Sequence, residues 1–136
     1  IVPEYFLAGS LSPVRSAGDV ISADFQSAKR AADVIFHAAQ RPTAVVCVND
    51  VSAHCLAAAV EARGLSVPRD LSVTGFDNLS ASISENITTV GQNFGEIARN
   101  ALTAVLRQLE KGVPAGDYVV RVPTVLVERS SVRSPE

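Results

Sequence analysis

The sequence has 136 residues, of which 47% are hydrophobic and 19% charged, and its formal net charge is -2. This composition is typical of one packed domain and argues against a disordered chain. There is no cluster of Lys and Arg, which argues against a free-standing nucleic-acid binder, and the apolar runs stay far below the roughly 18 residues of a membrane span. The sequence contains no Met and shows no signal peptide, so we expect a fragment or a processed product with a cytoplasmic location.

The amino-terminal third predicts one helix. Residues 1–21 are rich in turn formers and leave strand and loop open, with a short strand conceivable at residues 14–17. Apolar residues then recur at helical spacing from Ser22 to Ala39, where the Ser22 hydroxyl is placed to cap the first turn. The pair Arg41-Pro42 ends this helix, because a residue before proline avoids the helical conformation.

The central part predicts a strand, a helix and a second strand. The continuous β-favouring run Ala44–Val48 indicates a strand covered on both faces. A helix follows, and Gly64 occupies the position of a left-handed residue at its carboxyl end. A turn at Val67–Asp70 leads to the next strand, Leu71–Phe76. Short connections in a strand-helix-strand order predict an α/β fold with a parallel sheet and right-handed crossovers.

The tail has a different pattern. A short strand is predicted at Asn86–Val90, followed by the helix Phe94–Leu109, whose apolar residues form one wide stripe. Alternating residues at 117–122 indicate a half-exposed strand, residues 124–128 a last strand, and residues 130–136 a loose terminus.

Polar side chains follow both central strands, at the sheet edge where open parallel sheets bind ligands. The Asp77 carboxylate can accept two hydroxyl hydrogen bonds, as sugar recognition requires, or can belong to an ordinary polar turn. Asn49 can both donate to and accept from a ligand hydroxyl, whereas Asp50 is expected to cap the following helix, where the helix dipole favours a negative charge. These alternatives stay open on spacing alone.

Catalytic and metal-binding patterns are missing from the sequence. His37 and His54 lie on predicted helices without a paired ligand, and Cys47 and Cys55 have neither redox nor zinc-ligand spacing. We therefore expect two buried thiols in a reducing compartment, no metal, no cofactor and no enzymatic activity. No phosphate loop, dinucleotide fingerprint or nucleophile elbow supports the rival interpretation, a small flavodoxin-like enzyme.

The motifs T-A-V-V-C-V-N-D, V-P-R-D-L-S-V-T-G-F-D-N, I-T-T-V-G-Q and V-P-T-V-L-V-E-R-S, in this order, resemble the effector-binding core of LacI-type bacterial transcription regulators. The resemblance covers about residues 42–131. It implies a periplasmic-binding-protein-like lobe with helices on both faces of its sheet. Residues 1–90 would form the carboxyl-terminal lobe, residues 91–123 a hinge and a helix that packs on an amino-terminal lobe, and residues 124–136 the return strand and loose terminus.

The same resemblance implies the site and the partners. Asn49, Asp77 and Gln92 match the positions that face the effector, a sugar or related polar metabolite. Val20 stands where the family often has a stacking aromatic residue, which weakens the case for a pyranose or purine ring.

A homodimer would form through the helix Ser52–Arg63 and the loop after Asp77, with His54, Cys55 and Ala58 between the subunits. Operator DNA would be bound only through an amino-terminal helix-turn-helix outside this chain. A periplasmic sugar-binding lobe is the alternative, because such proteins share the two-lobe architecture.

Overall fold

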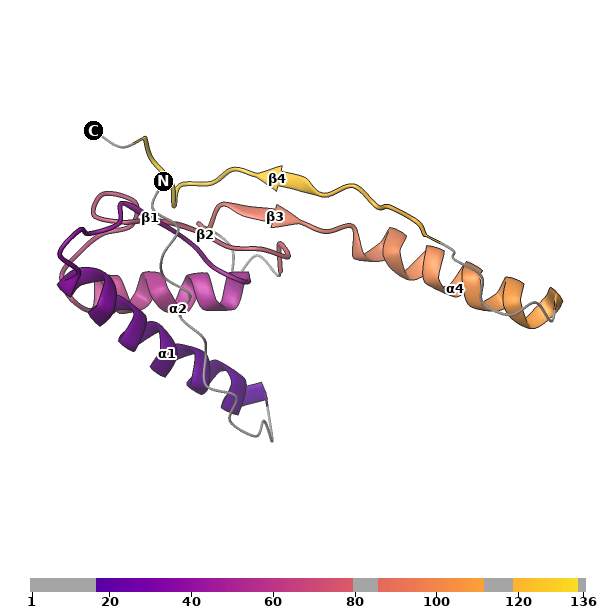
Figure 1. Ribbon diagram of the computed structural model, residues 1–136, viewed down its shortest axis with the longest axis horizontal. Coiled ribbons are helices and arrows are strands. Elements are labelled where there is room, and N and C mark those ends of the chain that lie inside the picture. The colour runs from indigo at the N-terminus through magenta and orange to yellow at the C-terminus, as the bar shows by residue number, and fades with distance from the viewer. Residues whose placement is uncertain (1–16, 80–85, 112–118, 135–136) are drawn as a thin grey trace.

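The computed structural model describes residues 17–79, 86–111 and 119–134, with residues 17–24 and Lys111 described by their backbone alone. In chain order its elements are α1 (Ala17–His37), β1 (Ala44–Val46), α2 (Asp50–Glu61), β2 (Ser72–Thr74), β3 (Thr89–Gly91), α4 (Phe94–Lys111) and β4 (Val125–Val127). Figure 1 shows two parts: an α/β core made of α1, β1, α2 and β2, and an arm in which β3 and β4 lead to α4.

The α/β core confirms the predicted parallel sheet. β1 and β2 pair in parallel, with Ala44 opposite Ser72 and Val46 opposite Thr74. Both α1 and α2 lie on one side of these strands (Figure 1). Small residues in the two helices permit close packing, and the buried apolar cluster they form with the sheet consists of Ala28, Ala32, Ile35, Ala53, Cys55, Leu56, Ala59, Val60, Leu71, Val73 and Ile87. Burial of these side chains is the main source of stability for the α/β core.

The prediction that residues 44–48 are covered on both faces is wrong for this chain. Val45 and Cys47 pack against the buried cluster, but Val46 and Val48 on the opposite face are 84% and 78% exposed. The physical reason is topological. A single right-handed crossover through α2 covers one face of a parallel pair, and covering the other face takes further helices.

Two boundary predictions also need correction. α1 begins at Ala17, so Ser22 lies inside the helix and does not cap it. The described residues of the segment 117–122, Val119 to Val122, are not a strand. An alternating pattern marks a strand only where a neighbouring strand can accept and donate the backbone hydrogen bonds.

The carboxyl-terminal segment returns to the α/β core. β4 runs antiparallel to β3, with Gly91 opposite Val125 and Thr89 opposite Val127. Beyond β4, the backbone N–H of Val73 donates to the carbonyl of Ser131 at 2.9 Å, and the Ser131 hydroxyl donates to the carbonyl of Val73 at 2.6 Å. Ser131 is 2% exposed, so the loose terminus does not begin at residue 130 as expected.

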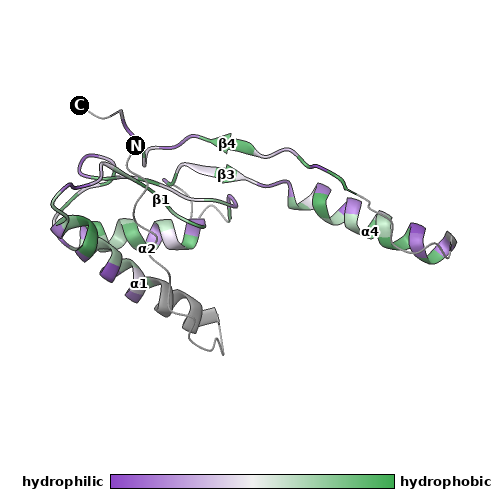
Figure 2. Ribbon diagram, in the orientation of Figure 1, coloured by the Kyte–Doolittle hydropathy of each residue, from purple (hydrophilic) through white to green (hydrophobic). Residues whose placement is uncertain are grey.

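α4 is the most exposed element of the described chain. Asn93 caps it: its side-chain oxygen accepts from the backbone N–H of Glu96 at 3.0 Å, and its amide donates to the Glu96 carboxylate at 3.1 Å. Figure 2 shows that this helix lies away from the α/β core and carries hydrophobic residues along its length. The large exposed ones are Phe94, Ile97, Leu102, Val105, Leu106 and Leu109, between 39% and 76% exposed. The wide apolar stripe predicted from the sequence therefore faces solvent.

Candidate functional site

The carboxyl ends of β1, β2 and β3 meet at one edge of the structure. β2 pairs with β1 in parallel, and two isolated parallel bridges, Thr74 with Thr88 and Asp77 with Gly91, join the continuation of β2 to β3. The backbone N–H of Asp77 donates to the carbonyl of Val90 at 2.9 Å. The residues that follow these strands are therefore neighbours. We call the set Asn49, Asp77 and Gln92 the strand-end site.

Asp77 and Gln92 are in direct contact. The Gln92 amide nitrogen donates to Asp77 Oδ1 at 2.5 Å, and both side chains are half-buried. Asp77 has a φ of 96° and Asn78 a φ of 52°, so two successive residues other than glycine adopt the left-handed conformation. Each such residue costs on the order of 1 kcal/mol or more, and this strain persists only where the surrounding contacts fix it. The turn gives the Asp77 carboxylate its direction at the end of the strand.

Asn49, and not Asp50, caps α2. Asn49 has extended backbone angles, and its Oδ1 accepts from the backbone N–H of Ser52 at 2.8 Å. The prediction that Asp50 is the cap is wrong. Both side chains suit the position, but the Asp50 carboxylate has donors elsewhere: the Thr89 hydroxyl at 2.5 Å and the backbone N–H of Leu79 at 2.8 Å.

Two other side chains fix the loop after β2 and were not found from the sequence. Arg129, which follows β4, donates to Asn78 Oδ1 at 2.8 Å and to the carbonyl of Ile87 at 2.7 Å. The Thr89 hydroxyl donates a hydrogen bond to the carboxylate of Asp50. The only available signal was their membership in the motifs that carry the family resemblance, because no local pattern predicts contacts over 39 to 51 residues.

The remaining predicted residues are placed as follows. Val20 lies in the first turn of α1, but its side chain is outside the described residues. His54 is exposed on α2, as required of a surface contact, whereas Cys55 is 4% exposed and packs inside the chain. The expectation that Cys55 lies between subunits is therefore wrong, because its side of α2 faces the α/β core.

Cys47 is half-buried at the end of β1. Burial raises the pKa of its thiol to about 12, because an apolar environment disfavours the charged thiolate. This cysteine is therefore a poor nucleophile at neutral pH. In the part of the chain that the structure describes, no group of three His, Cys, Asp or Glu residues is arranged to hold a metal ion, and no helix is long and apolar enough to cross a membrane.

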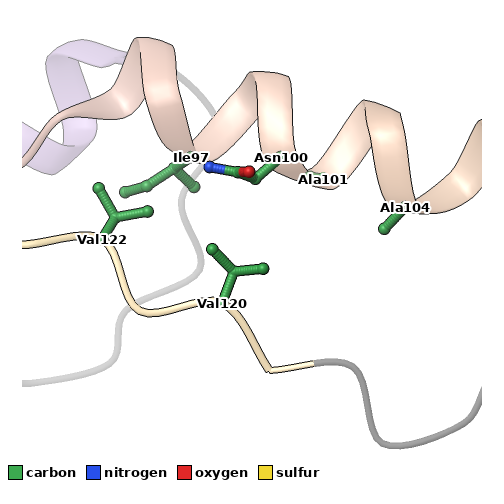
Figure 3. Close-up of a pocket in the computed structure, with 6 residues that line it drawn as sticks. All are labelled: Ile97, Asn100, Ala101, Ala104, Val120 and Val122. Atoms are coloured by element: carbon green, nitrogen blue, oxygen red, sulfur yellow. The ribbon is translucent and has the colours of Figure 1, made fainter.

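A hollow lies on the arm, away from the strand-end site. It has a volume of about 380 Å³ between α4 and the segment that precedes β4. Figure 3 shows the side chains that line it: Ile97, Asn100, Ala101, Ala104, Val120 and Val122. This lining is apolar except for one amide, in contrast to the strand-end site, where a carboxylate and two amides lie at the ends of strands.

Comparison with known proteins agrees with this architecture. The model of a protein family described as a periplasmic binding protein-like domain matches residues 8–132. The chain belongs to this family. Among members with curated names, the transcriptional repressor PurR of Vibrio atlanticus is 34% identical over 119 residues, which are 85% of this chain and 35% of that protein. The transcriptional repressor CytR of Escherichia coli is 30% identical over an alignment of 140 positions, which covers 96% of this chain and 41% of that protein.

Solved structures show the same relationship. A LacI-type transcription regulator from Bifidobacterium animalis subsp. lactis matches with a TM-score of 0.66 and 31% identity, over 79% of this chain and 39% of that one. A LacI family regulator from Arthrobacter, solved in complex with lactose, matches with a TM-score of 0.64 and 25% identity, over 82% and 41%. The resemblance to LacI-type regulators and the α/β, periplasmic-binding-protein-like fold are thus confirmed. The chain spans about 28–41% of the length of its curated PurR and CytR relatives.

Proposed function

We propose that this chain is the carboxyl-terminal lobe of the effector-binding core of a transcription regulator, and that it acts in the cytoplasm. The observation that carries the proposal is the contact between Asp77 and Gln92 at the carboxyl ends of β2 and β3. Both residues match the family positions that face an effector, and they come from different elements. The named relatives support the regulatory class over the periplasmic sugar-binding alternative, because they are transcriptional repressors and not enzymes or transport proteins.

The ligand class follows from the polar groups of the strand-end site. The Asp77 carboxylate offers acceptors to hydroxyl groups, and one of its oxygens already takes the Gln92 amide. Asn49 uses its oxygen to cap α2, so its amide nitrogen is the group placed to donate to a ligand. One carboxylate with two amides suits a neutral molecule that carries several hydroxyls. We propose a sugar or a related polar metabolite, and the lactose complex of the Arthrobacter regulator supports this class.

The proposed mechanism is a shift of population between open and closed states of a cleft. An effector that binds the closed state more tightly favours closure, and only this difference in affinity can drive the change. Residues 91–123 would form the hinge and, through α4, the contact with a second lobe, and β4 would return from that lobe to the first. The exposed apolar side chains of α4 support this role, because a contiguous apolar surface of this kind marks an interaction site.

The proposed partners follow the family pattern. A homodimer would form through α2 and the loop after Asp77, where His54 is exposed and Ala58 half-buried. Operator DNA would be contacted through a helix-turn-helix outside this sequence. The link to the strand-end site would be the hinge geometry, which sets how a dimer presents its two DNA-binding units.

The function can be tested by nuclear magnetic resonance on the isotope-labelled chain. We would titrate lactose, ribose and adenosine, three probes rich in hydroxyls, into the wild-type chain and into an Asp77→Ala variant. Weak binding is expected from half a cleft, and its chemical-shift changes should centre on the Asn49, Asp77 and Gln92 amides. The Asp77→Ala substitution should weaken it by about tenfold or more, since a charge-assisted hydrogen bond is worth about 1.5–3 kcal/mol.

Two controls make this titration decisive. An Asp33→Ala variant changes an exposed carboxylate on α1, an element that contributes no residue to the strand-end site, and should bind as the wild type does. Shifts that centre on the hollow beneath α4, or an Asp77→Ala variant that binds all three probes unchanged, would remove the strand-end site from the function.

A further inference from the structure

Asp50 is a buried carboxylate to which the proposed function gives no role. It is fully buried at the first position of α2, with an exposed fraction of 0%. Its Oδ1 accepts from the Thr89 hydroxyl at 2.5 Å, its Oδ2 accepts from the backbone N–H of Leu79 at 2.8 Å, and its own N–H donates to the carbonyl of Phe76 at 3.0 Å. One residue therefore connects the start of α2, the loop after β2 and the start of β3.

The backbone around Asp50 is shaped to admit the carboxylate. Gly75 is buried, and a Cβ atom added there would lie 2.3 Å from Asp50 Oδ1 and 3.0 Å from Asp50 Cα. No real side chain tolerates such a contact, so the glycine is what leaves space for this carboxylate. A buried charge is costly unless hydrogen bonds compensate it. The Thr89 hydroxyl and the Leu79 N–H compensate this charge, and an apolar residue at position 50 would remove the acceptor of the buried Thr89 hydroxyl.

The three contacts of Asp50 enclose the strained turn. Phe76 precedes Asp77, and Leu79 follows Asn78, so Asp50 holds the backbone on both sides of the two left-handed residues. The Thr89 hydroxyl that donates to Asp50 also accepts from the backbone N–H of Asn78 at 3.4 Å. The buried Asp50 carboxylate thus contributes, together with Arg129, to holding the turn in which Asp77 contacts Gln92.

We propose that Asp50 is a positioning residue, which with Thr89 holds the Asp77 turn in the conformation that presents its carboxylate to Gln92 and to a ligand hydroxyl. The effect on ligand affinity rests on the proposed function, but the effect on the Asp77–Gln92 contact does not. A residue with a purely structural role would change the stability of the chain and leave that contact unaltered.

The first test needs no ligand. We would record the side-chain amide signals of Gln92 and the hydrogen exchange of the Leu79 backbone amide in Thr89→Val, which has nearly the shape of threonine but no hydroxyl. The Gln92 signals should shift toward those of an exposed amide, and Leu79 exchange should accelerate by about tenfold or more. Thr89→Ser, which restores a hydroxyl, should recover both signals.

A matched control separates positioning from stability. Ser131→Ala removes another buried hydroxyl, in the turn after β4, which accepts from the Thr88 backbone at 2.8 Å and donates to the Val73 carbonyl. It should lower the urea midpoint as Thr89→Val does, but leave the Gln92 signals in place. If Ser131→Ala shifts the Gln92 signals equally, or if Thr89→Val leaves them unchanged, Asp50 has no positioning role. Should Thr89→Val fail to fold, Asp50→Asn gives the same reading, because the amide cannot accept from both Thr89 and Leu79.

The second test measures affinity with lactose, ribose and adenosine. Thr89→Val should weaken the binding of a probe about tenfold when Asp77 is present, and should have no further effect in the Asp77→Ala background, because Thr89 acts through Asp77. Equal weakening in both backgrounds would refute the inference. If the wild-type chain binds none of the probes, the proposed function fails, and the Gln92 signals still decide whether Asp50 positions the turn.

Discussion

Replacing Gly75 with alanine is the most demanding test of the packing around Asp50. The new Cβ would lie 2.3 Å from Asp50 Oδ1 and 3.0 Å from Asp50 Cα, so either the carboxylate or the backbone of α2 must move. Overpacking of this kind costs about 1–3 kcal/mol. A carboxylate that moves away from Thr89 loses one charge-assisted hydrogen bond, worth about 1.5–3 kcal/mol. Alanine also reduces the conformational entropy of the unfolded chain, which offsets about 0.4–1 kcal/mol of this destabilisation.

The balance predicts that Gly75→Ala lowers the free energy of unfolding by about 3 kcal/mol, a large part of the 5–15 kcal/mol typical of a domain. Urea unfolding followed by far-ultraviolet circular dichroism would show this as a midpoint lowered by about 2 M, for a slope of about 1.5 kcal/mol per molar. The exchange rate of the Ser72 amide, which donates to the carbonyl of Thr43 within the α/β core at 2.9 Å, gives a second measure that fraying of the arm does not affect.

Gly64→Ala is the matched control. Gly64 has a φ of 74°, but no atom lies within 4 Å of its added Cβ, so alanine there costs only the left-handed conformation, about 1 kcal/mol. Gly75 needs no positive φ, so a larger loss at this position reports its contact with Asp50. If Gly75→Ala is no more destabilising than Gly64→Ala, the packing argument for Asp50 is wrong. In a double variant that carries both Gly75→Ala and Asp50→Ala, the loss of unfolding free energy should be far smaller than the sum of the losses in the two single variants.

Three further outcomes are expected from other parts of the chain. Cys47 should react with iodoacetamide at pH 8 much more slowly in the folded chain than in urea, and equal reaction rates would contradict this. Because burial raises the pKa of this thiol to about 12 from 9.0, the free energy of unfolding should fall between pH 9 and 12, where only the unfolded thiol loses its proton. Sedimentation at high concentration should show self-association through α4, which Leu106→Lys reduces and Gln108→Lys does not; a wild-type chain that stays monomeric would exclude it. The hydrogen bond and charge of Arg63 lower the pKa of Asp33, so this ion pair stabilises the chain above the usual carboxyl pKa of 3.8, and the stabilisation is lost as the pH falls below that value. Asp33→Asn should therefore flatten this part of the acid unfolding curve, and the effect should be small because the pair is exposed.

The sequence predicts the α/β core well, because its evidence is local. The apolar run that begins at Ala44, the helix that follows and the apolar run at Leu71 each determine one element, and short connections then require parallel pairing. Gln92 is expected at the site only through the resemblance to LacI-type regulators, and the parallel bridge between Asp77 and Gly91 explains why the two side chains meet.

The exchange of roles between Asn49 and Asp50 could not be predicted in this way. Both side chains suit a helix cap, and the choice depends on Thr89 and Leu79, which are 39 and 29 residues away in the sequence. The left-handed turn at Asp77 has the same origin, because it is held by contacts and not by residue type. Distant hydrogen bonds, rather than local propensity, determine the details of the strand-end site.

The ribbon formed by β3 and β4 restricts how the arm can move. Two hydrogen-bonded strands resist sliding past each other, whereas bending out of the plane of the ribbon breaks no bond between them. The easiest motion of α4 relative to the α/β core is therefore a swing about one axis. An 18-residue helix is about 27 Å long, so a tilt of about 10° at the ribbon moves its far end by about 5 Å. Gln92 is the second residue before this helix, so a tilt of the ribbon beside the strand-end site would move the far end of α4 by this distance.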